Sequence, residues 1–288
     1  MAHFVYSAFA DEAATDLGEQ MRCLSEEGIS MLELRGVDGI NCADLNEEEA
    51  LSIHKKLAKQ HITLSALGSP FGKIGITDPF EEHLKQFEKT LEICKILECT
   101  RIRMFSFYIP HEEEPEKYRD EVLSRLEKMI ELAGKADILL VHENEKGIYG
   151  DTPERCMELY RHFDGEMGIA FDPANYVQCG VDPLEAYQMQ KDTITYFHMK
   201  DALKDDGSVV CVGQGDGSVP EILCDVNRSR KEDVILTIEP HLHIFDGVQT
   251  LQEEALRGKV SYANSRTAFH AACEAMRKCM KEVEEKSC

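Results

Sequence analysis

The sequence predicts a single-domain α/β fold in which eight parallel strands close into a barrel and a helix follows each strand. Short apolar runs alternate with longer amphipathic segments eight times along the 288 residues, and such alternation implies a parallel sheet. No proline- or serine-rich linker and no low-complexity block divides the chain. This length suits one (β/α)8 barrel, or TIM barrel, so we expect residues 1–288 to form one domain.

The predicted strands are short runs rich in apolar residues. The fifth is the clearest, because residues 138–141 are four apolar residues in a row, typical of a strand buried on both faces. In chain order, the predicted strands cover residues 4–9, 31–35, 62–67, 101–107, 138–141, 169–171, 194–197 and 234–238.

Caps and breakers set the boundaries of the predicted helices. Asn46 and Thr152 are expected N-caps, and Gly28 is expected to stop the first helix. Pro79 suits the first position of the third helix. The predicted helices cover residues 15–27, 47–60, 78–97, a segment that ends near 134, 152–163, a short segment from 182, a segment from about 220, and 263–284.

An open, doubly wound sheet is the alternative to a closed barrel. It would need a dinucleotide- or phosphate-binding loop after an early strand, and the chain has neither GxGxxG nor a P-loop sequence. The glycine-rich residues 212–217 follow the seventh strand instead, so we interpret them as a loop that covers a site.

The charge of the chain excludes several classes of partner. Lys and Arg total 32 against 54 Asp and Glu, which gives a formal charge of −22. Such a charge repels phosphate backbones and anionic membrane surfaces, so we expect neither nucleic-acid nor membrane binding. No run approaches the ~20 apolar residues that a membrane span needs, and no early segment is typical of a signal peptide. The 11 cysteines are scattered, without a CxxC pair, which indicates reduced thiols and a cytoplasmic protein.

Four of the later strands end in a carboxylate or an imidazole. These residues are Glu143, Asp172, His198 and Glu239. In a TIM barrel the active site lies at the carboxyl ends of the strands, and strand parity permits all four side chains to face inward. A single acid at a strand end is more often a helix cap or a solvated group, so the prediction of a metal site depends on the joint pattern. Three carboxylates and one imidazole suit Mn²⁺, Mg²⁺ or Co²⁺ at least as well as Zn²⁺, and the absence of a thiolate favours one Mn²⁺ ion.

The segments around these residues resemble the xylose isomerase-like TIM barrels, a group of sugar phosphate isomerases and epimerases that includes ketose 3-epimerases and inosose dehydratase-like enzymes. The resemblance rests on residues 143–144, 172–175, 198–201 and 238–240, with further similarity at 33–35, 68–73 and 213–216, and covers about residues 4–245. It implies the same four metal ligands and an enzyme that acts on carbohydrates. One position departs from the family, because many members have His where this chain has Glu145.

Six further residues are candidate substrate contacts. They are Lys200, Arg35, Arg103, Lys73, Glu145 and His142. A phosphorylated substrate would need such cations, whereas Arg35 and Arg103 could instead pair with Glu33 and other barrel carboxylates. His142 has the opposite strand parity to Glu143, which favours a packing or supporting role.

Four functional hypotheses remain open at this point. The first is a metal-dependent sugar or sugar phosphate isomerase or epimerase, in which Glu143 and Glu239 move a proton next to a carbonyl through an enediolate. The second is a lyase on the same barrel, either a dehydratase or a carbon–glycoside-cleaving enzyme, with His142, Glu145 or Lys200 as the acid. The third is an endonuclease IV-like repair enzyme, which the charge and the single ligand set oppose. The fourth is a barrel that only binds a sugar. A homo-oligomer is compatible with each hypothesis.

Overall fold

The computed structural model describes residues 1–243 and 262–287. The barrel strands are β1 (His3–Ala8), β2 (Met31–Leu34), β5 (Thr63–Gly68), β6 (Arg101–Met104), β7 (Leu139–Glu143), β8 (Met167–Phe171), β9 (Ile194–Met199) and β12 (Asp233–Ile238). They close in the order β1-β12-β9-β8-β7-β6-β5-β2, and each neighbouring pair is parallel. The predicted TIM barrel is therefore confirmed.

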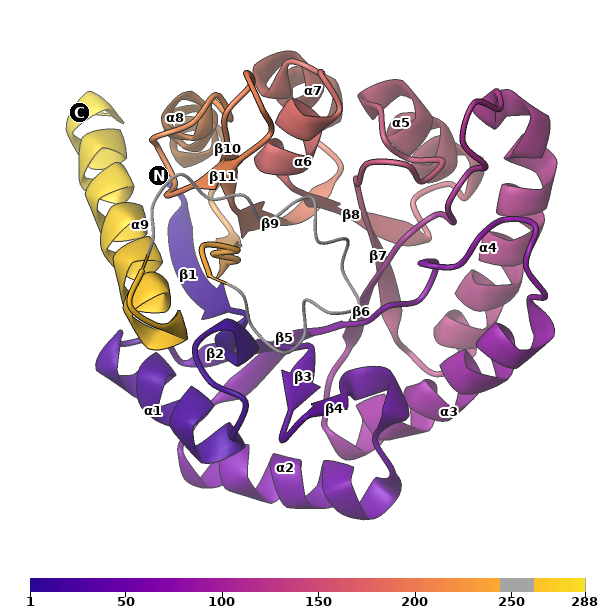
Figure 1. Cartoon of the computed structure of the whole chain (residues 1–288), viewed down its shortest axis with the longest axis horizontal. Helices are drawn as coiled ribbons and strands as arrows, with labels where there is room; N and C mark the ends of the chain where they lie inside the picture. The colour runs from indigo at the N-terminus through magenta and orange to yellow at the C-terminus, as the bar shows by residue number, and fades with distance from the viewer. Residues whose placement is uncertain (244–261, 288) are drawn as a thin grey trace.

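Helices surround the barrel strands as an outer ring (Figure 1). They are α1 (Leu17–Glu26), α2 (Glu47–Lys59), α3 (Glu81–Ile96), α4 (Arg119–Lys135), α5 (Pro153–His162), α6 (Pro173–Gln178), α7 (Pro183–Gln190), α8 (Val219–Ser229) and α9 (Ser265–Ser287). Two short hairpins, β3–β4 (Gly36–Val37 and Ile40–Asn41) and β10–β11 (Asp201–Ala202 and Val209–Val210), follow β2 and β9.

Most helix boundaries follow the predicted caps. The side chain of Asn46 accepts a hydrogen bond from the backbone of Glu49, whose own side chain bonds back to Asn46 in a capping box. The hydroxyl oxygen of Thr152 accepts the backbone N–H of Arg155 and caps α5. Gly28 follows α1 with a φ of +68°, a conformation that glycine adopts without strain.

Two local predictions differ from the structure. Pro79 does not begin α3, because the side chain of Asp78 accepts the backbone N–H of Gly75 and closes a turn there, and the helix starts at Glu81. The sequence analysis also missed α6, which begins immediately after β8. Its N-cap is Asp172, and Pro173 occupies the first helical turn.

The interior of the barrel is filled by small and apolar side chains from alternate positions of the strands. Ala66, Val141, Ala170 and Tyr196 form one buried cluster, and Leu139 packs against it. Since Leu139 and Val141 face inward, strand alternation directs Glu143 inward as well. A larger apolar core fills the space between the strands and the helices.

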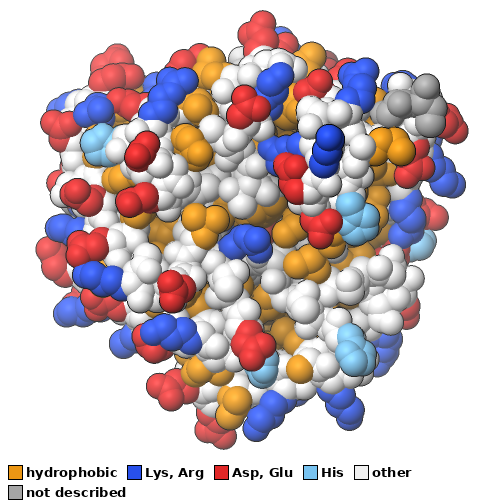
Figure 2. Space-filling view, turned by 180° about the vertical axis from the view of Figure 1, so that it is seen from behind, with side chains coloured by type: hydrophobic (Ala, Val, Ile, Leu, Met, Phe, Trp, Pro, Cys, Tyr) orange, Lys and Arg blue, Asp and Glu red, His pale blue; other side chains and the backbone are white. Residues whose placement is uncertain are grey.

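Acidic and basic side chains are interspersed on the face of the molecule opposite to the view of Figure 1 (Figure 2). Among the residues that the structure describes, no helix is both long and apolar enough to cross a membrane.

The loop after β5 lies unusually close to the chain after β6. Gly72 has a φ of +85°, and a Cβ atom built there would lie 2.0 Å from the carbonyl oxygen of Phe105. Backbone hydrogen bonds from Phe105 to Phe71 and from Phe107 to Gly72 hold the two segments together. This close approach holds the loop in place, and the loop positions Ser69 and Lys73 at the mouth of the barrel.

We expect Gly72→Ala to lower the free energy of unfolding by at least about 2 kcal/mol, because it adds left-handed backbone strain to a steric overlap. The matched control is Gly134→Ala in the last turn of α4, where a Cβ meets nothing within 4 Å. That variant should stay within about 1 kcal/mol of the parent. Urea unfolding of the three proteins measures both effects, and equal stability of Gly72→Ala and the parent would contradict the close approach.

Candidate active site

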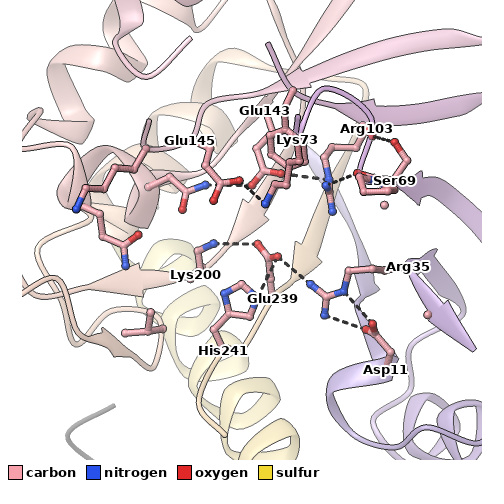
Figure 3. A pocket seen from close by; sticks show the side chains of 18 of the residues that line it. Asp11, Arg35, Ser69, Lys73, Arg103, Glu143, Glu145, Lys200, Glu239 and His241 are labelled. Carbon is pink, nitrogen blue, oxygen red and sulfur yellow. Dashed lines mark hydrogen bonds and ion pairs between the residues drawn. The ribbon is translucent and has the colours of Figure 1, made fainter. Parts of the chain in front are cut away.

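A cavity of about 620 Å³ opens at the carboxyl ends of the barrel strands. Glu143 and Glu239 line it together with cationic side chains that include those of Arg35, Arg103 and Lys200 (Figure 3). In TIM barrels the active site lies at the carboxyl ends of the strands.

The structure brings the four predicted ligands together. Ligand atoms of Glu143, Asp172, His198 and Glu239 all lie within 4.8 Å of one another, and the four side chains are buried. The Nδ1 atom of His198 is 3.0 Å from Glu143 Oε1 and 3.5 Å from Glu239 Oε2. Glu143 and Glu239 line the cavity, whereas Asp172 and His198 lie behind them with no exposed surface.

Two asparagines hold the carboxylates of this cluster in place. The side chain of Asn144 accepts the backbone N–H of Asp172 and donates to its carbonyl oxygen, which ties the end of β7 to the end of β8. Asn175, in α6, donates its side-chain amide to Glu143 Oε1 at 3.2 Å. Its backbone N–H donates to Asp172 Oδ1, which leaves Oδ2 of Asp172 directed at Lys200 Nζ, 2.8 Å away. Asp172 is thus both a helix cap and a member of the cluster.

Burial and charge act against each other on the ionisable groups of the cluster. Burial would raise the pKa of Glu143, but His198 and Arg103 lower it to about 2. Burial raises the pKa of Asp172 to about 7, with Lys200 acting in the opposite direction. The pKa of Glu239 lies well below its usual value, because Lys200 and other cations outweigh the effect of burial. Burial would lower the pKa of His198, yet Glu143 and neighbouring carboxylates raise it well above the usual range.

The donor set fits one divalent cation. Metal–oxygen and metal–nitrogen bonds of ~2.0–2.2 Å place neighbouring ligand atoms about 3–4.4 Å apart, which is close to the spacing in this cluster. Five carboxyl groups of the described residues are buried at or just inside the mouth, those of Glu12, Glu33, Glu143, Asp172 and Glu239. Within the part of the chain that the structure describes, three permanently charged cations are buried beside them, those of Arg35, Arg103 and Lys200. The carboxyl groups therefore outnumber the permanent cations beside them, which favours a cation at this position.

The candidate cations for substrate binding are paired with carboxylates. Arg35 forms a two-pronged contact with Asp11 and also reaches Glu12 and Glu239. Arg103 lies 3.2 Å from Glu143 Oε2, and Lys73 lies 2.6 Å from Glu145 Oε2 at the rim of the cavity. Figure 3 shows these side chains around one opening. Arg35 and Arg103 therefore pair with carboxylates, which was the alternative raised from the sequence. Their direct partners are not Glu33 but Asp11, Glu12, Glu143 and Glu239.

His142 is the one candidate contact that the structure keeps out of the cavity. Its ring is fully buried on the other side of β7, and Nε2 is 2.9 Å from Ser106 Oγ. Burial lowers the pKa of His142 to about 4. The strand parity noted in the sequence explains this position, and a direct substrate contact from His142 does not fit it.

The glycine-rich loop also has a different role from the one expected. Its backbone N–H groups at Gly213, Gly215 and Gly217 donate to the buried carboxylate of Asp201. The cavity is lined instead by the turn between β10 and β11, residues 204–207. The sequence alone cannot distinguish an acid such as Asp201, which binds the backbone of a loop, from an acid that lines a functional site.

Sequence reasoning missed several residues that reach or support the cluster. Asp11 and Glu12 follow β1, so the strand-end pattern that found the other acids also applied to them. His241 lines the cavity two residues after Glu239, and its backbone N–H donates to Glu12. The backbone φ of His241 is +43°, which is uncommon for a residue other than glycine. The sequence contains no pattern that predicts this conformation.

Comparison with known proteins agrees with the fold seen in the structure. Residues 23–259 match the family described as xylose isomerase-like TIM barrel. The chain belongs to this family. None of the curated proteins matches the sequence.

Several solved structures share the fold of this chain at low sequence identity. A structure of L-ribulose 3-epimerase has a TM-score of 0.75 at 13% identity, covering 100% of this chain and 97% of that one. The IOLI protein with a binding zinc atom has a TM-score of 0.74 at 14% identity, covering 97% and 99%. The probable 3-DHS dehydratase AsbF from Bacillus anthracis has a TM-score of 0.72 at 15% identity, covering 96% and 99%.

We expect the protein to bind one divalent ion per chain, and His198→Ala or Asp172→Asn to weaken Mn²⁺ binding by at least about 100-fold. The loss of a direct ligand should exceed the 10–100-fold that loss of a supporting contact costs. Glu145→Gln, a carboxylate change at the rim, is the control and should leave the affinity unchanged. Calorimetric titration and metal analysis of protein purified without chelator test this, and a parent protein without bound or titratable metal would refute it.

Proposed function

We propose that the protein is a metal-dependent isomerase or epimerase that moves a carbon-bound proton next to a carbonyl in a sugar. The observation that carries this proposal is the placement of two carboxylates, Glu143 and Glu239, on one cavity and within one ligand cluster. A bound divalent ion would supply a Lewis acid that polarises the carbonyl and its neighbouring hydroxyl.

The two carboxylates approach the cavity from β7 and β12, so they can address different faces of a substrate. One would remove the proton from carbon and the other would return a proton to the opposite face of the enediolate. Both are held in place: Glu239 contacts Arg35 at 3.3 Å and Lys200 at 3.2 Å, and Glu143 contacts Asn175 and Arg103. Their lowered pKa values keep both ionised at neutral pH, as a base requires.

The pairing of the cations favours an uncharged sugar over a sugar phosphate. A phosphate that bound Arg35 or Arg103 would take that cation away from a buried carboxylate, and leaving such a charge unpaired costs about 3–5 kcal/mol. Lys73 and Glu145, which pair at the rim, are better placed to bind hydroxyl groups, because they offer a donor and an acceptor side by side.

A lyase is the second candidate, and the cavity itself supports it. Elimination needs an acid beside the leaving group, and Glu145, Lys200 and His241 all line the cavity. His142, the other acid considered from the sequence, does not. Appearance of an enone absorbance during turnover would distinguish elimination from epimerisation.

A hydride shift would require a second metal. A second group of possible ligands, Glu12, Glu239 and His241, lies beside the first. Its two carboxylates already contact the guanidinium of Arg35, which competes with a second cation. The endonuclease hypothesis would need several metal ions and a basic surface, which the charge of −22 disfavours.

We expect the true substrate to exchange a carbon-bound hydrogen with solvent, because a carboxylate that accepts a carbon proton can trade it with water before returning it. Glu239→Gln should lower kcat at least ~10²-fold, the usual loss for a missing general acid or base. Glu131→Gln, an exposed carboxylate of α4 that does not line the cavity, is the matched control and should retain most of the activity. Turnover of ketoses and inososes with Mn²⁺ in D₂O, followed by NMR, measures the exchange.

Metal content must be determined on the same samples, because Glu239 is also a proposed ligand. Retention of the substrate hydrogen in D₂O, together with an active and metal-loaded Glu239→Gln variant, would overturn the proton-transfer proposal.

A further inference from the structure

Glu33 is a fully buried carboxylate inside the barrel, next to the ligand cluster but outside it. Both of its oxygens lie 3.2 Å from Nε2 of His198, and Oε1 also accepts the hydroxyl of Tyr196 at 2.9 Å. Glu33 and His198 have no exposed surface, and Tyr196 belongs to the apolar cluster of the barrel interior. An ionisable group at such a position is costly unless specific partners compensate it.

The backbone directs Glu33 to this position. The pairing of β2 with β5 shifts register between Leu32 and Glu33, which brings Glu33 opposite Ala66. A register shift of this kind inserts a residue on one strand and redirects the side chains that follow it. The small side chain of Ala66 leaves space inside the barrel for the carboxylate to reach across to β9.

The two nitrogens of the His198 ring face different carboxylates. Nε2 faces Glu33, whereas Nδ1 faces Glu143 Oε1 at 3.0 Å, within the ligand cluster. A metal ligand must present a nitrogen lone pair, and the hydrogen bond made by the other nitrogen decides which one is free of a proton.

We infer that Glu33 is a positioning residue, which holds the proton of His198 on Nε2 so that Nδ1 is directed at the metal. The inference rests on the metal site of the proposed function and adds a residue to it. Glu33 does not line the cavity, and its direct contact with the ligand set is through His198. Tyr196, which lies on β9 like His198, donates its hydroxyl to the carboxylate of Glu33. It makes no hydrogen bond to the His198 nitrogen proposed as the metal ligand.

This arrangement gives a matched pair of variants. Glu33→Met removes the acceptor for Nε2 and keeps a similar volume, and we expect it to weaken Mn²⁺ binding about 10–100-fold, the usual effect of losing such a partner. Tyr196→Phe removes the other hydrogen bond to the same carboxylate and should change the affinity by less than about 3-fold, because the contact from Nε2 remains. Glu33→Gln retains one acceptor oxygen and should fall between the two. Calorimetric titration with Mn²⁺, without substrate, measures all three, and circular dichroism checks that each is folded.

Nitrogen NMR of the Zn²⁺-loaded parent protein gives a readout that a merely structural role would not produce. We expect Nε2 of His198 to carry the proton and Nδ1 to bind the metal. A metal-bound Nε2, or a folded Glu33→Met variant with the affinity of Tyr196→Phe, would overturn the inference while the metal site stands. If Glu33→Met does not fold, Glu33→Gln and the NMR assignment of the parent decide. A parent protein that binds no metal would instead refute the metal site itself.

Discussion

The arrangement at the mouth of the barrel depends on the compensation of buried negative charge. Among the described residues, five carboxyl groups are buried at or just inside the mouth, and three permanent cations and His198 are buried among them. Each cation touches at least one of these acids, so a change at one residue alters the environment of several others. Removing one member of a buried pair is costly, which makes the cluster rigid as well as polar.

The fold provides this cluster through strand direction and alternation. Parallel strands bring their carboxyl ends to one mouth, and the inward parity of β7 carries Glu143 there above Val141. The asparagines at positions 144 and 175 then lock neighbouring strand ends together. Glu33, one level inside the barrel, orients His198 from behind. The same elements that close the barrel therefore also position its chemistry.

The sequence was sufficient to predict the barrel and its four central residues, because both follow from local patterns. Apolar runs mark strands, and an acid or imidazole at a strand end is visible without coordinates. The parity of His142 likewise indicated its position on the outer side of β7. Contacts between residues on distant strands could not be predicted in this way. The contact of Glu33 with His198 joins residues 165 positions apart, and nothing in either local segment specifies it. The start of α3 at Glu81, the short helix α6 and the role of Asp201 also depend on side-chain contacts that a linear pattern does not contain.

The most direct test of this account is the location of a bound metal. A crystal of the protein with Mn²⁺, measured at a wavelength where manganese scatters anomalously, should show one strong peak per chain. We predict that it lies within ~2.0–2.3 Å of carboxylate oxygens of Glu143, Asp172 and Glu239 and of Nδ1 of His198. A peak between Glu12 and His241 instead, or no peak in crystals grown with excess Mn²⁺, would contradict the account.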